Sequence, residues 1–215
     1  MVRYTGLPGE TLAAELAAGA ARGERLKYLY FWGHRPQRDG SVGAGCLSQW
    51  WPAPFTVAGE TYATAEHWMM AGKARLFGDE EARAEVLAAG HPRDAKAAGR
   101  TVRGFDEERW RAERFAVVVE GSVHKFGQHP ALGAYLLGTG ERVLVEASPV
   151  DPVWGIGLAA DDALAQDPAH WRGLNLLGFA LMAARERLRA PQPQPEPPVR
   201  GRPGSSACGR RRPGC

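Results

Sequence analysis

The sequence predicts an α+β fold that is mainly α-helical. Helix patterns with an acidic cap and first-turn acids begin at Asp79 and Asp106, and a third helix with a strong apolar face starts near Leu174. Strand patterns are few and short: residues 26–32 are aromatic and alternating, and residues 142–146 show β-branched alternation. Short helices therefore dominate the predicted fold.

The first half of the chain leads to one central helix. Residues 10–21 are Ala-rich and predict a short helix, whereas residues 33–45, rich in Gly, Pro and charge, predict a loop. Residues 55–62 then predict two short strands joined by a tight Ala-Gly turn. This hairpin delivers the chain to residues 64–77, the helix around which we expect the fold to be organised.

The second half begins with two capped helices. The helix after Asp79 closes at Gly90, and the longer helix after Asp106 carries Trp110. A further short helix ends at Gly138. The strand at residues 142–146 and the final helix complete the order of elements.

Length and composition indicate an ordinary globular protein. A chain of 215 residues suits one sizeable domain. It has no apolar run long enough for a membrane span and no signal-peptide pattern, so we expect a cytoplasmic protein without a membrane partner. Its three cysteines form neither a disulfide framework nor a C-x-x-C metal site. The sequence does not indicate an oligomeric state.

Charge and composition change at residue 190. The formal net charge is +3, and residues 191–215 hold five arginines and one glutamate, so the tail carries +4 and the body −1. The tail is Pro-rich with almost no apolar content, which predicts disorder. We therefore expect an arm and short helix at residues 1–25, a globular domain at 26–190, and a disordered Pro/Arg-rich tail.

The helix at residues 64–77 carries the first candidates for chemistry. Thr64 fits the N-cap, which places Glu66 in the first turn, where the helix dipole favours its ionised form. At helical pitch Glu66 and Lys73 share one side of a helix that is apolar nearly all round. Because buried charges are costly unless paired, solvated or used, a structural ion pair and a catalytic role stand about equal. His67 fits a hydrogen-bonded packing role better.

A stiff loop carries the second group of candidates. Prolines flank Asp151 and glycines follow Trp154, so the loop is rigid and allows close approach to a ligand. Asp151 either caps a turn or contacts a sugar and positions water, with Trp154 stacking on a ring. By spacing alone, Trp110 fits the core, and Asn175 fits a cap of the last helix better than a ligand donor.

The commonest metal and nucleotide motifs are absent from the sequence. His124 and His129 are five residues apart, and no H-E-x-x-H or paired-Cys pattern occurs, so no zinc or iron site is expected. G-x-x-x-x-G-K-[ST], G-x-G-x-x-G and G-x-S-x-G are missing as well. The chemistry must then come from carboxylates, a lysine and aromatic rings, without a cofactor.

The chain resembles the NADAR, or YbiA-like, family in five motifs that follow one another in order: S-Q-W-W-P-A-P-F, Y-A-T-A-E-H-W-M-M-A-G-K-A, K-F-G-Q-H, L-L-G-T-G-E-R-V-L-V-E-A-S-P-V-D-P-V-W-G-I-G-L and W-R-G-L-N-L-L-G-F-A-L-M-A-A-R. The resemblance spans residues 28–188 and leaves out the arm and the tail. It implies a compact multi-helical catalytic domain with a small antiparallel sheet, in agreement with the patterns above.

The resemblance implies an N-glycosidase that hydrolyses the C–N bond between a base and ribose phosphate or ADP-ribose. Phosphoribosylaminopyrimidine intermediates of riboflavin biosynthesis are the substrates we expect first. Alternatively, the substrate is an ADP-ribosylated guanine in nucleic acid. A third possibility is a module that binds an ADP-ribose or NAD derivative without turnover, which the presence of two carboxylates and a lysine disfavours.

The motifs carry the family's functional residues over to this chain. The catalytic positions are Glu66, Lys73 and Asp151, the substrate-binding position is Trp110, and the weaker substrate-binding positions are Trp154 and Asn175. Glu66 or Asp151 would stabilise the oxocarbenium character at C1′, activate water or protonate the base. Lys73 would hold a phosphate, orient Glu66, or attack C1′ to form a Schiff base.

The tail offers a separate route to nucleic acid. Its arginines at residues 210–212 could contact phosphates, with binding that weakens steeply with salt. One short cluster fits a solvated appendage better, so the sequence favours the small ribosylated base as the partner.

Overall fold

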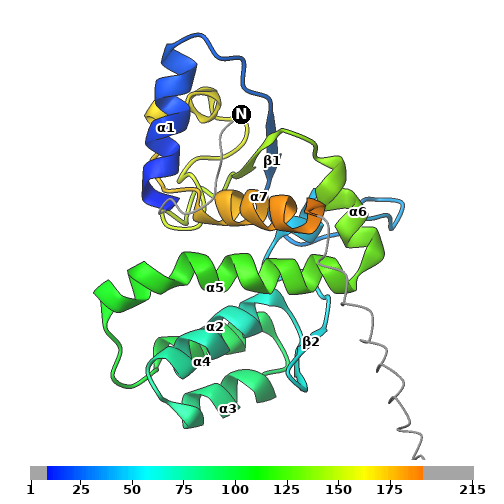
Figure 1. Cartoon of the computed structure of the whole chain (residues 1–215), viewed down its shortest axis with the longest axis vertical. Coiled ribbons are helices and arrows are strands. Elements are labelled where there is room, and N and C mark those ends of the chain that lie inside the picture. Colours follow the sequence, from blue (N-terminus) through cyan, green and yellow to red (C-terminus); the bar gives the residue numbers. More distant parts are fainter. Residues whose placement is uncertain (1–8, 191–215) are drawn as a thin grey trace, which may run out of the picture.

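The computed structural model describes residues 9–190 and consists mainly of helices with a few short strands (Figure 1). The predicted α+β, mainly α class is therefore confirmed. Residues 1–8 of the predicted arm and the predicted tail at 191–215 lie outside the described residues.

The elements follow a helix-rich order with two pairs of short strands. In chain order they are α1 (Gly9–Ala21), β1 (Tyr28–Phe31), η1 (Ala44–Leu47), β2 (Phe55–Val57), β3 (Glu60–Tyr62), α2 (Ala65–Leu76), α3 (Glu80–Ala88), α4 (Pro92–Arg100), α5 (Glu107–Gln128), α6 (Pro130–Gly138), β4 (Val143–Glu146), η2 (Ala163–Gln166), η3 (Pro168–His170) and α7 (Leu176–Arg189).

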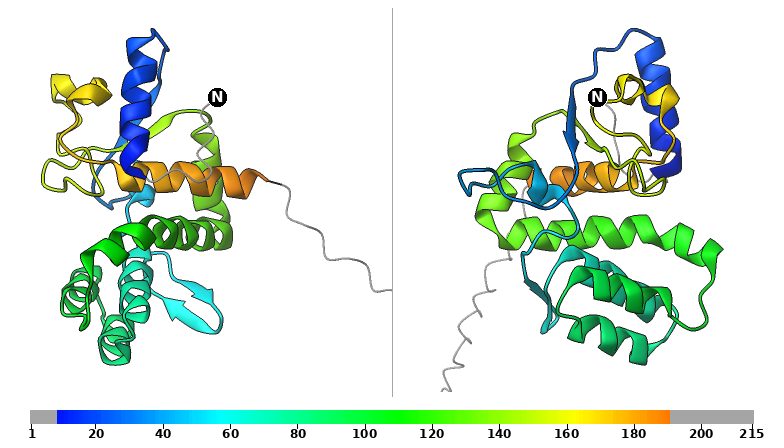
Figure 2. Two further views of the ribbon diagram at one scale, coloured as in Figure 1. Left: turned by 60° about the vertical axis from the view of Figure 1, so that its left-hand side comes forward. Right: turned by 180° about the vertical axis from the view of Figure 1, so that it is seen from behind.

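Helix α5 is the central element of the fold. It lies between α7 on one side and α2 on the other, and α3 and α4 complete the lower helical layer (Figures 1 and 2). The upper part holds α1, the β1 and β4 strands and the loop that leads to α7. The α2 helix is thus buried between neighbours, as its nearly all-apolar circumference predicts.

The strands form two separate pairs. Phe55 to Val57 and Glu60 to Tyr62 pair antiparallel across a turn in which Ala58 has φ 50° and Gly59 has φ 84°, both in the left-handed region. This hairpin is the predicted small antiparallel sheet. β1 and β4 pair parallel, with Phe31 opposite Glu146, so the carboxyl ends of both strands meet at one edge.

Two local differences from the sequence prediction concern the helices. The sequence indicated no element between Gly90 and Asp106, where the structure has α4, with Pro92 at its first turn and the His91 side chain accepting from Arg93 N. Helix α5 also continues to Gln128 and so includes most of the K-F-G-Q-H motif. The buried face of α4 is built from Pro, Ala and Gly, so the helix lacks the large apolar residues that mark the other helices in the sequence.

Close packing of α2 against α5 depends on a glycine. Gly121 of α5 lies directly over the indole of Trp68, and a Cβ at this position would collide with that ring. The Trp68 indole Nε1–H donates to the Val117 carbonyl at 2.8 Å, which fixes the ring orientation. The central helices therefore approach at a distance that small residues alone permit.

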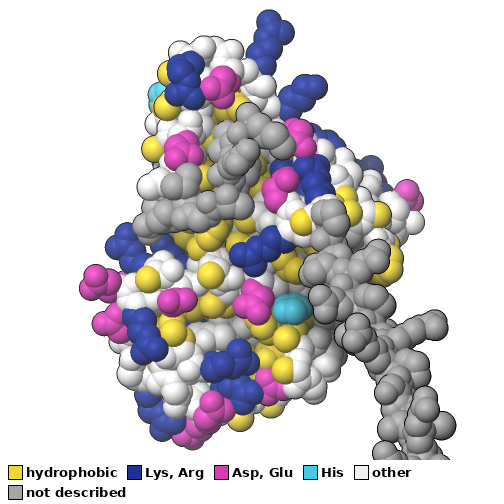
Figure 3. Space-filling model, viewed as in Figure 1, with side chains coloured by type: hydrophobic (Ala, Val, Ile, Leu, Met, Phe, Trp, Pro, Cys, Tyr) yellow, Lys and Arg dark blue, Asp and Glu magenta, His cyan; other side chains and the backbone are white. Residues whose placement is uncertain are grey.

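The surface carries charges of both signs. Figure 3 shows Lys and Arg side chains interspersed with Asp and Glu over this face, without a large area of a single sign. This matches the near-neutral body computed from the sequence, and it leaves the described domain without a broad basic surface on this face. None of the described helices is both long and apolar enough to cross a bilayer.

Candidate active site

The N-terminus of α2 places Glu66 in a buried position. Thr64 is the N-cap, as predicted, and its Oγ1 accepts from His67 N at 3.5 Å. The Glu66 N–H donates to the Gln49 carbonyl at 3.0 Å, which ties the start of α2 to the Trp-rich segment before the hairpin. Only 2% of Glu66 is exposed, so its carboxyl group lies inside the protein.

His67 has the packing role that its position off the Glu66 side predicts. Its Nδ1 lies 2.8 Å from Thr64 Oγ1 and its Nε2 lies 3.0 Å from the Ala89 carbonyl. A carbonyl only accepts, so Nε2 carries the proton and Nδ1 accepts from the threonine hydroxyl. Burial lowers the pKa of His67, which keeps the ring neutral and leaves no lone pair free for chemistry.

The Glu66 carboxyl group is incompletely bonded. It accepts a hydrogen bond from the Trp50 side chain, whereas its Oε1 is buried without a partner. Burial raises the pKa of Glu66 to about 7, while the charge of Lys96 and the Trp50 hydrogen bond oppose this rise. Desolvation therefore acts against the helix dipole, which favours the ionised form, and it is the larger of the two effects.

A third carboxylate, Glu146, joins the two that the sequence predicted. It ends β4, and its Oε2 is buried without a partner. Burial raises the pKa of Glu146 to about 8, and the charges of Asp151 and Glu66 act in the same direction. Sequence reasoning missed Glu146 because it falls in a strand pattern, although it stands five residues before Asp151 in the same motif.

The Asp151 loop is folded back onto the end of β4. Asp151 Oδ1 accepts from Val153 N at 3.0 Å and from Trp154 N at 2.8 Å, so the predicted turn-capping role is present. The Ile156 N–H donates to the Glu146 carbonyl at 2.9 Å, which closes the loop. One oxygen of Asp151 thus fixes the loop, while its charge acts on both Glu66 and Glu146.

Asn175 holds the strand that carries Glu146. Its Nδ2 donates to the Leu144 carbonyl and its Oδ1 accepts from Glu146 N, both at 2.9 Å. It is fully buried and has φ 51°, a left-handed conformation that Asn tolerates. Its side chain makes no capping bond to α7. In this structure its carboxamide is engaged with β4 backbone, and its predicted contact with substrate stays a prediction.

Lys73 lies apart from the carboxylates, among aromatic rings. Its Nζ is 4.0 Å from the centroid of the Phe105 ring and 6.0 Å from that of Trp110. Within residues 9–190 no ion pair joins Lys73 to Glu66, so the proposed internal salt bridge is not formed. Burial lowers the pKa of Lys73, with Glu107 opposing and Arg100 adding to this effect. Trp110 is 8% exposed, which limits the ring area open to a base.

Helix α4 contributes the positive charges of the site. Lys96 acts electrostatically on Glu66 and Glu146, and Arg100, one turn further along, acts on Glu66 and Lys73. The two basic side chains therefore connect the carboxylates at one end of the site with Lys73 at the other. Neither was predicted from the sequence, because the helix itself was not recognised.

Trp154, in the Asp151 loop, and Trp32, at the end of β1, differ in their exposure. Trp154 is partly buried and packs against the core, and its carbonyl accepts from Leu177 N at 3.1 Å. Trp32 directly follows β1 and is 62% exposed. Because Phe31 is opposite Glu146, Trp32 leaves the sheet at the same edge as the carboxylates. Trp32 is the more open aromatic surface at this edge.

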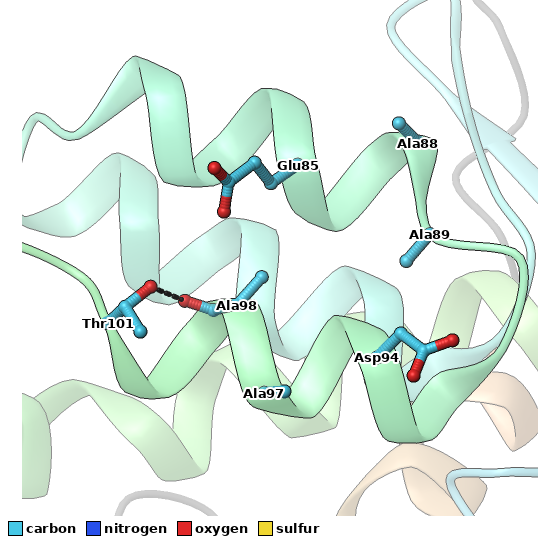
Figure 4. Close-up of a pocket in the computed structure, with 7 residues that line it drawn as sticks. All are labelled: Glu85, Ala88, Ala89, Asp94, Ala97, Ala98 and Thr101. Atoms are coloured by element: carbon cyan, nitrogen blue, oxygen red, sulfur yellow. Dashed lines mark hydrogen bonds between the residues drawn. The ribbon is translucent and has the colours of Figure 1, made fainter.

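A pocket elsewhere on the molecule contains none of the predicted residues. It has a volume of about 530 Å³ and lies between α3 and α4, where Glu85 points from α3 toward α4 and Asp94 lies near the start of α4 (Figure 4). Thr101 at its end is bonded to the Ala98 carbonyl at 2.9 Å. In the part of the chain that the structure describes, no three His, Cys, Asp or Glu side chains are arranged to hold a metal ion.

The chain is similar to known glycosidases over most of its length. It is 41% identical over 168 residues to N-glycosidase R617 of Acanthamoeba polyphaga mimivirus, covering 76% of this chain and 97% of the relative. It is 34% identical over 135 residues to N-glycosidase YbiA of Escherichia coli, covering 63% of this chain and 76% of the relative. The chain is thus an enzyme of the N-glycosidase class.

The structural and family comparisons agree with this class. The NMR structure of E. coli YbiA matches with a TM-score of 0.61 at 29% identity, covering 77% of this chain and 86% of that chain. The NADAR domain model matches residues 30–189. The chain belongs to the NADAR family, and the resemblance that its motifs carry is confirmed.

Proposed function

We propose that this enzyme hydrolyses the N-glycosidic bond of phosphoribosylaminopyrimidines, the intermediates of riboflavin biosynthesis. The observation that carries the proposal is the buried Glu66 carboxyl group with an unpartnered oxygen, beside Asp151 and Glu146 in a NADAR domain. A carboxyl group whose pKa is about 7 exchanges its proton near neutral pH, which suits general acid–base catalysis. A module that only binds its ligand has no need of such a group.

The charges of the site suggest how the substrate is oriented. A phosphate is repelled by the three carboxylates and attracted by Arg100 and Lys73, so the phosphate end would point toward α4 and Lys73. C1′ would then lie near Glu66 and Asp151, where negative charge stabilises an oxocarbenium-like transition state. Trp110 or Trp154 would contact the flat base.

Two roles for Lys73 remain as distinct mechanisms. As a phosphate ligand it needs only its charge, whereas as a nucleophile it needs its neutral amine, which the lowered pKa favours. A nucleophilic lysine forms a bond to C1′ as the base leaves, and the opened sugar is held as a Schiff base until water releases it. Borohydride reduction during turnover traps that adduct, and Lys73→Ala abolishes it.

The proposal is tested by release of free base from purified enzyme. Phosphoribosylaminopyrimidine is the first substrate, and ADP-ribosylated guanine, free and in DNA, is the second. Glu66→Gln and Asp151→Asn should each lower the rate by about 10²-fold or more. Glu85→Gln, a carboxyl-to-amide change in the pocket of Figure 4, is the matched control and should retain full activity.

Other results of the same assays would support one of the two alternative functions. Release from ADP-ribosylated guanine alone would make the enzyme an ADP-ribosyl-guanine glycohydrolase. Tight binding of ADP-ribose by calorimetry, with no base released from either substrate, would replace catalysis by a binding role. Unchanged rates in both carboxylate variants would refute the assignment of the site.

A further inference from the structure

We propose that Glu146 is a catalytic residue of this enzyme: it protonates the departing base while Glu66 receives the proton of the attacking water. This inference rests on the proposed N-glycosidase function and adds a residue to its mechanism. It starts from the position of Glu146 at the end of β4, where two parallel strands finish and the Asp151 loop begins.

The backbone around Glu146 is fixed on every side. Its N–H donates to Asn175 Oδ1 and its carbonyl accepts from Ile156 N, both at 2.9 Å. Gly155 approaches so closely that a Cβ there would lie 2.9 Å from the Glu146 carbonyl oxygen. With its main chain bonded in both directions, the residue offers only its carboxyl group to the site. A group held in this way has the preorganisation that catalysis requires.

The two glutamates leave unsatisfied oxygens inside the protein. Glu66 Oε1 and Glu146 Oε2 are both buried without a hydrogen-bond partner among the described residues. A buried acceptor without a donor costs about 1–3 kcal/mol, and an ionised carboxylate only accepts. One proton on the pair removes one of the two charges and supplies an O–H donor. The pair is therefore expected to hold one proton at neutral pH.

The surroundings decide which glutamate holds the proton. Glu66 accepts from Trp50, lies in the first turn of α2, and is near the positive charges of Lys96 and Arg100. Of the described residues, Lys96 favours ionised Glu146, whereas Glu66 and Asp151 oppose it; Asp151 opposes ionised Glu66 as well. These neighbours favour ionised Glu66 and protonated Glu146. Raised pKa values of about 7 and about 8 agree with this order.

Accessibility gives Glu146 the outer position. Glu66 is 2% exposed, whereas Glu146 is only half-buried. The exposed Trp32 directly follows β1, whose last residue is paired with Glu146. A base that rests at this edge would meet the Glu146 carboxyl group.

The proton balance of the reaction fits such a pair. When the C1′–N bond breaks, its electron pair stays on the base nitrogen, which takes the proton of Glu146. Water bonds to C1′ and its proton passes to Glu66. The pair carries one negative charge before and after, and transfer of the proton from Glu66 to Glu146 restores the starting state. The leaving base needs this proton whether water or Lys73 attacks C1′.

The test has one arm that requires no substrate. In protein labelled with ¹³C at the glutamate carboxyl carbon, NMR should show one neutral carboxyl signal near neutral pH that disappears in Glu146→Gln. In Glu66→Gln the same signal should remain, and it should titrate at the same pH as in the unmodified protein or at a lower one. A Glu146 carboxyl group that is ionised throughout the neutral range would overturn the proposal.

The second arm measures turnover against pH. Glu146→Gln should lower kcat by about 10²-fold or more and remove the fall in rate at alkaline pH, and Glu146→Asp should recover part of the rate with that fall restored. A merely structural role would leave the shape of the profile unchanged, and that result would overturn the proposal. If the unmodified enzyme releases no base while the NMR signal is present, the proposed function is refuted, whereas the proton shared by Glu66 and Glu146 is still supported.

Discussion

Replacing Asn175 tests whether this residue supports the site through the fold. In Asn175→Ala, the Leu144 carbonyl and the Glu146 N–H lose the partners that now lie at 2.9 Å. Both groups are in the interior strand β4, and an unsatisfied buried group costs about 1–3 kcal/mol. The two losses together amount to about 2–6 kcal/mol. Alanine at φ 51° adds about 1 kcal/mol of backbone strain.

A second substitution separates these two contributions. Asn175→Gly loses the same hydrogen bonds but accepts the left-handed conformation without strain. The free energy of unfolding should therefore fall in both variants, with the alanine variant about 1 kcal/mol lower than the glycine variant. Urea titration followed by circular dichroism measures the difference.

The matched control is another carboxamide, Gln37→Ala. Gln37 is exposed and its Nε2 makes one 3.3 Å bond to Val42, so the change should stay within about 0.5 kcal/mol. A loss below about 1 kcal/mol in Asn175→Gly would refute the account, since two buried groups cannot lose their partners at that cost. Asn175 would then be free for the substrate contact that the sequence predicts.

Three further predictions follow from the same geometry. Burial gives Glu66 a folded-state pKa of about 7 against a usual 4.5, so its contribution to stability is present below pH 4.5 and is lost as the pH rises through 7. The change that Glu66→Gln makes in the free energy of unfolding should therefore be more stabilising at pH 8 than at pH 4, by up to about 3 kcal/mol. An equal effect at both pH values in urea titrations would contradict this. Gly121→Ala should destabilise the fold by about 1–3 kcal/mol because its methyl group meets the Trp68 ring, whereas Gly138→Ala, with open space around it, is the control in thermal melts. Phe105→Leu removes the ring at 4.0 Å from Lys73 Nζ and should lower any yield of borohydride-trapped adduct at neutral pH. An unchanged yield, measured by mass spectrometry, would show that the ring does not affect the reactivity of the amine.

The sequence predicted those elements that local chemistry decides. Thr64, Asp79 and Asp106 all cap the helices expected of them, since a short polar side chain before an amphipathic run satisfies the first free N–H groups. The hairpin followed from its turn and alternating residues for the same reason. The parallel pairing of β1 with β4 could not be predicted in this way, because its strands are more than a hundred residues apart.

Three residues of the candidate site, Lys96, Arg100 and Glu146, were not predicted from the sequence, and the physical reason is a different one. Lys96 and Arg100 lie on a helix whose buried face is made of Ala95, Gly99 and Pro92, and none of these is a large apolar residue of the kind that marks the other helices. Glu146 ends an apolar strand, where a polar residue ordinarily marks the way out to solvent. Only tertiary packing turns that end inward.

Glu66 shows how this tertiary contribution changes the chemistry. The cap and the helix dipole act over one turn and favour the carboxylate by a few tenths to about 1 kcal/mol. Burial between Gln49, Trp50 and α4 acts in the opposite direction and raises the pKa from its usual 4.5 to about 7, which corresponds to about 3 kcal/mol. The larger effect wins, so the helix that looked suited to a permanent anion holds a group that exchanges a proton near pH 7. The position of Glu66 is therefore set by its own sequence, whereas its reactivity is set by the elements that cover it.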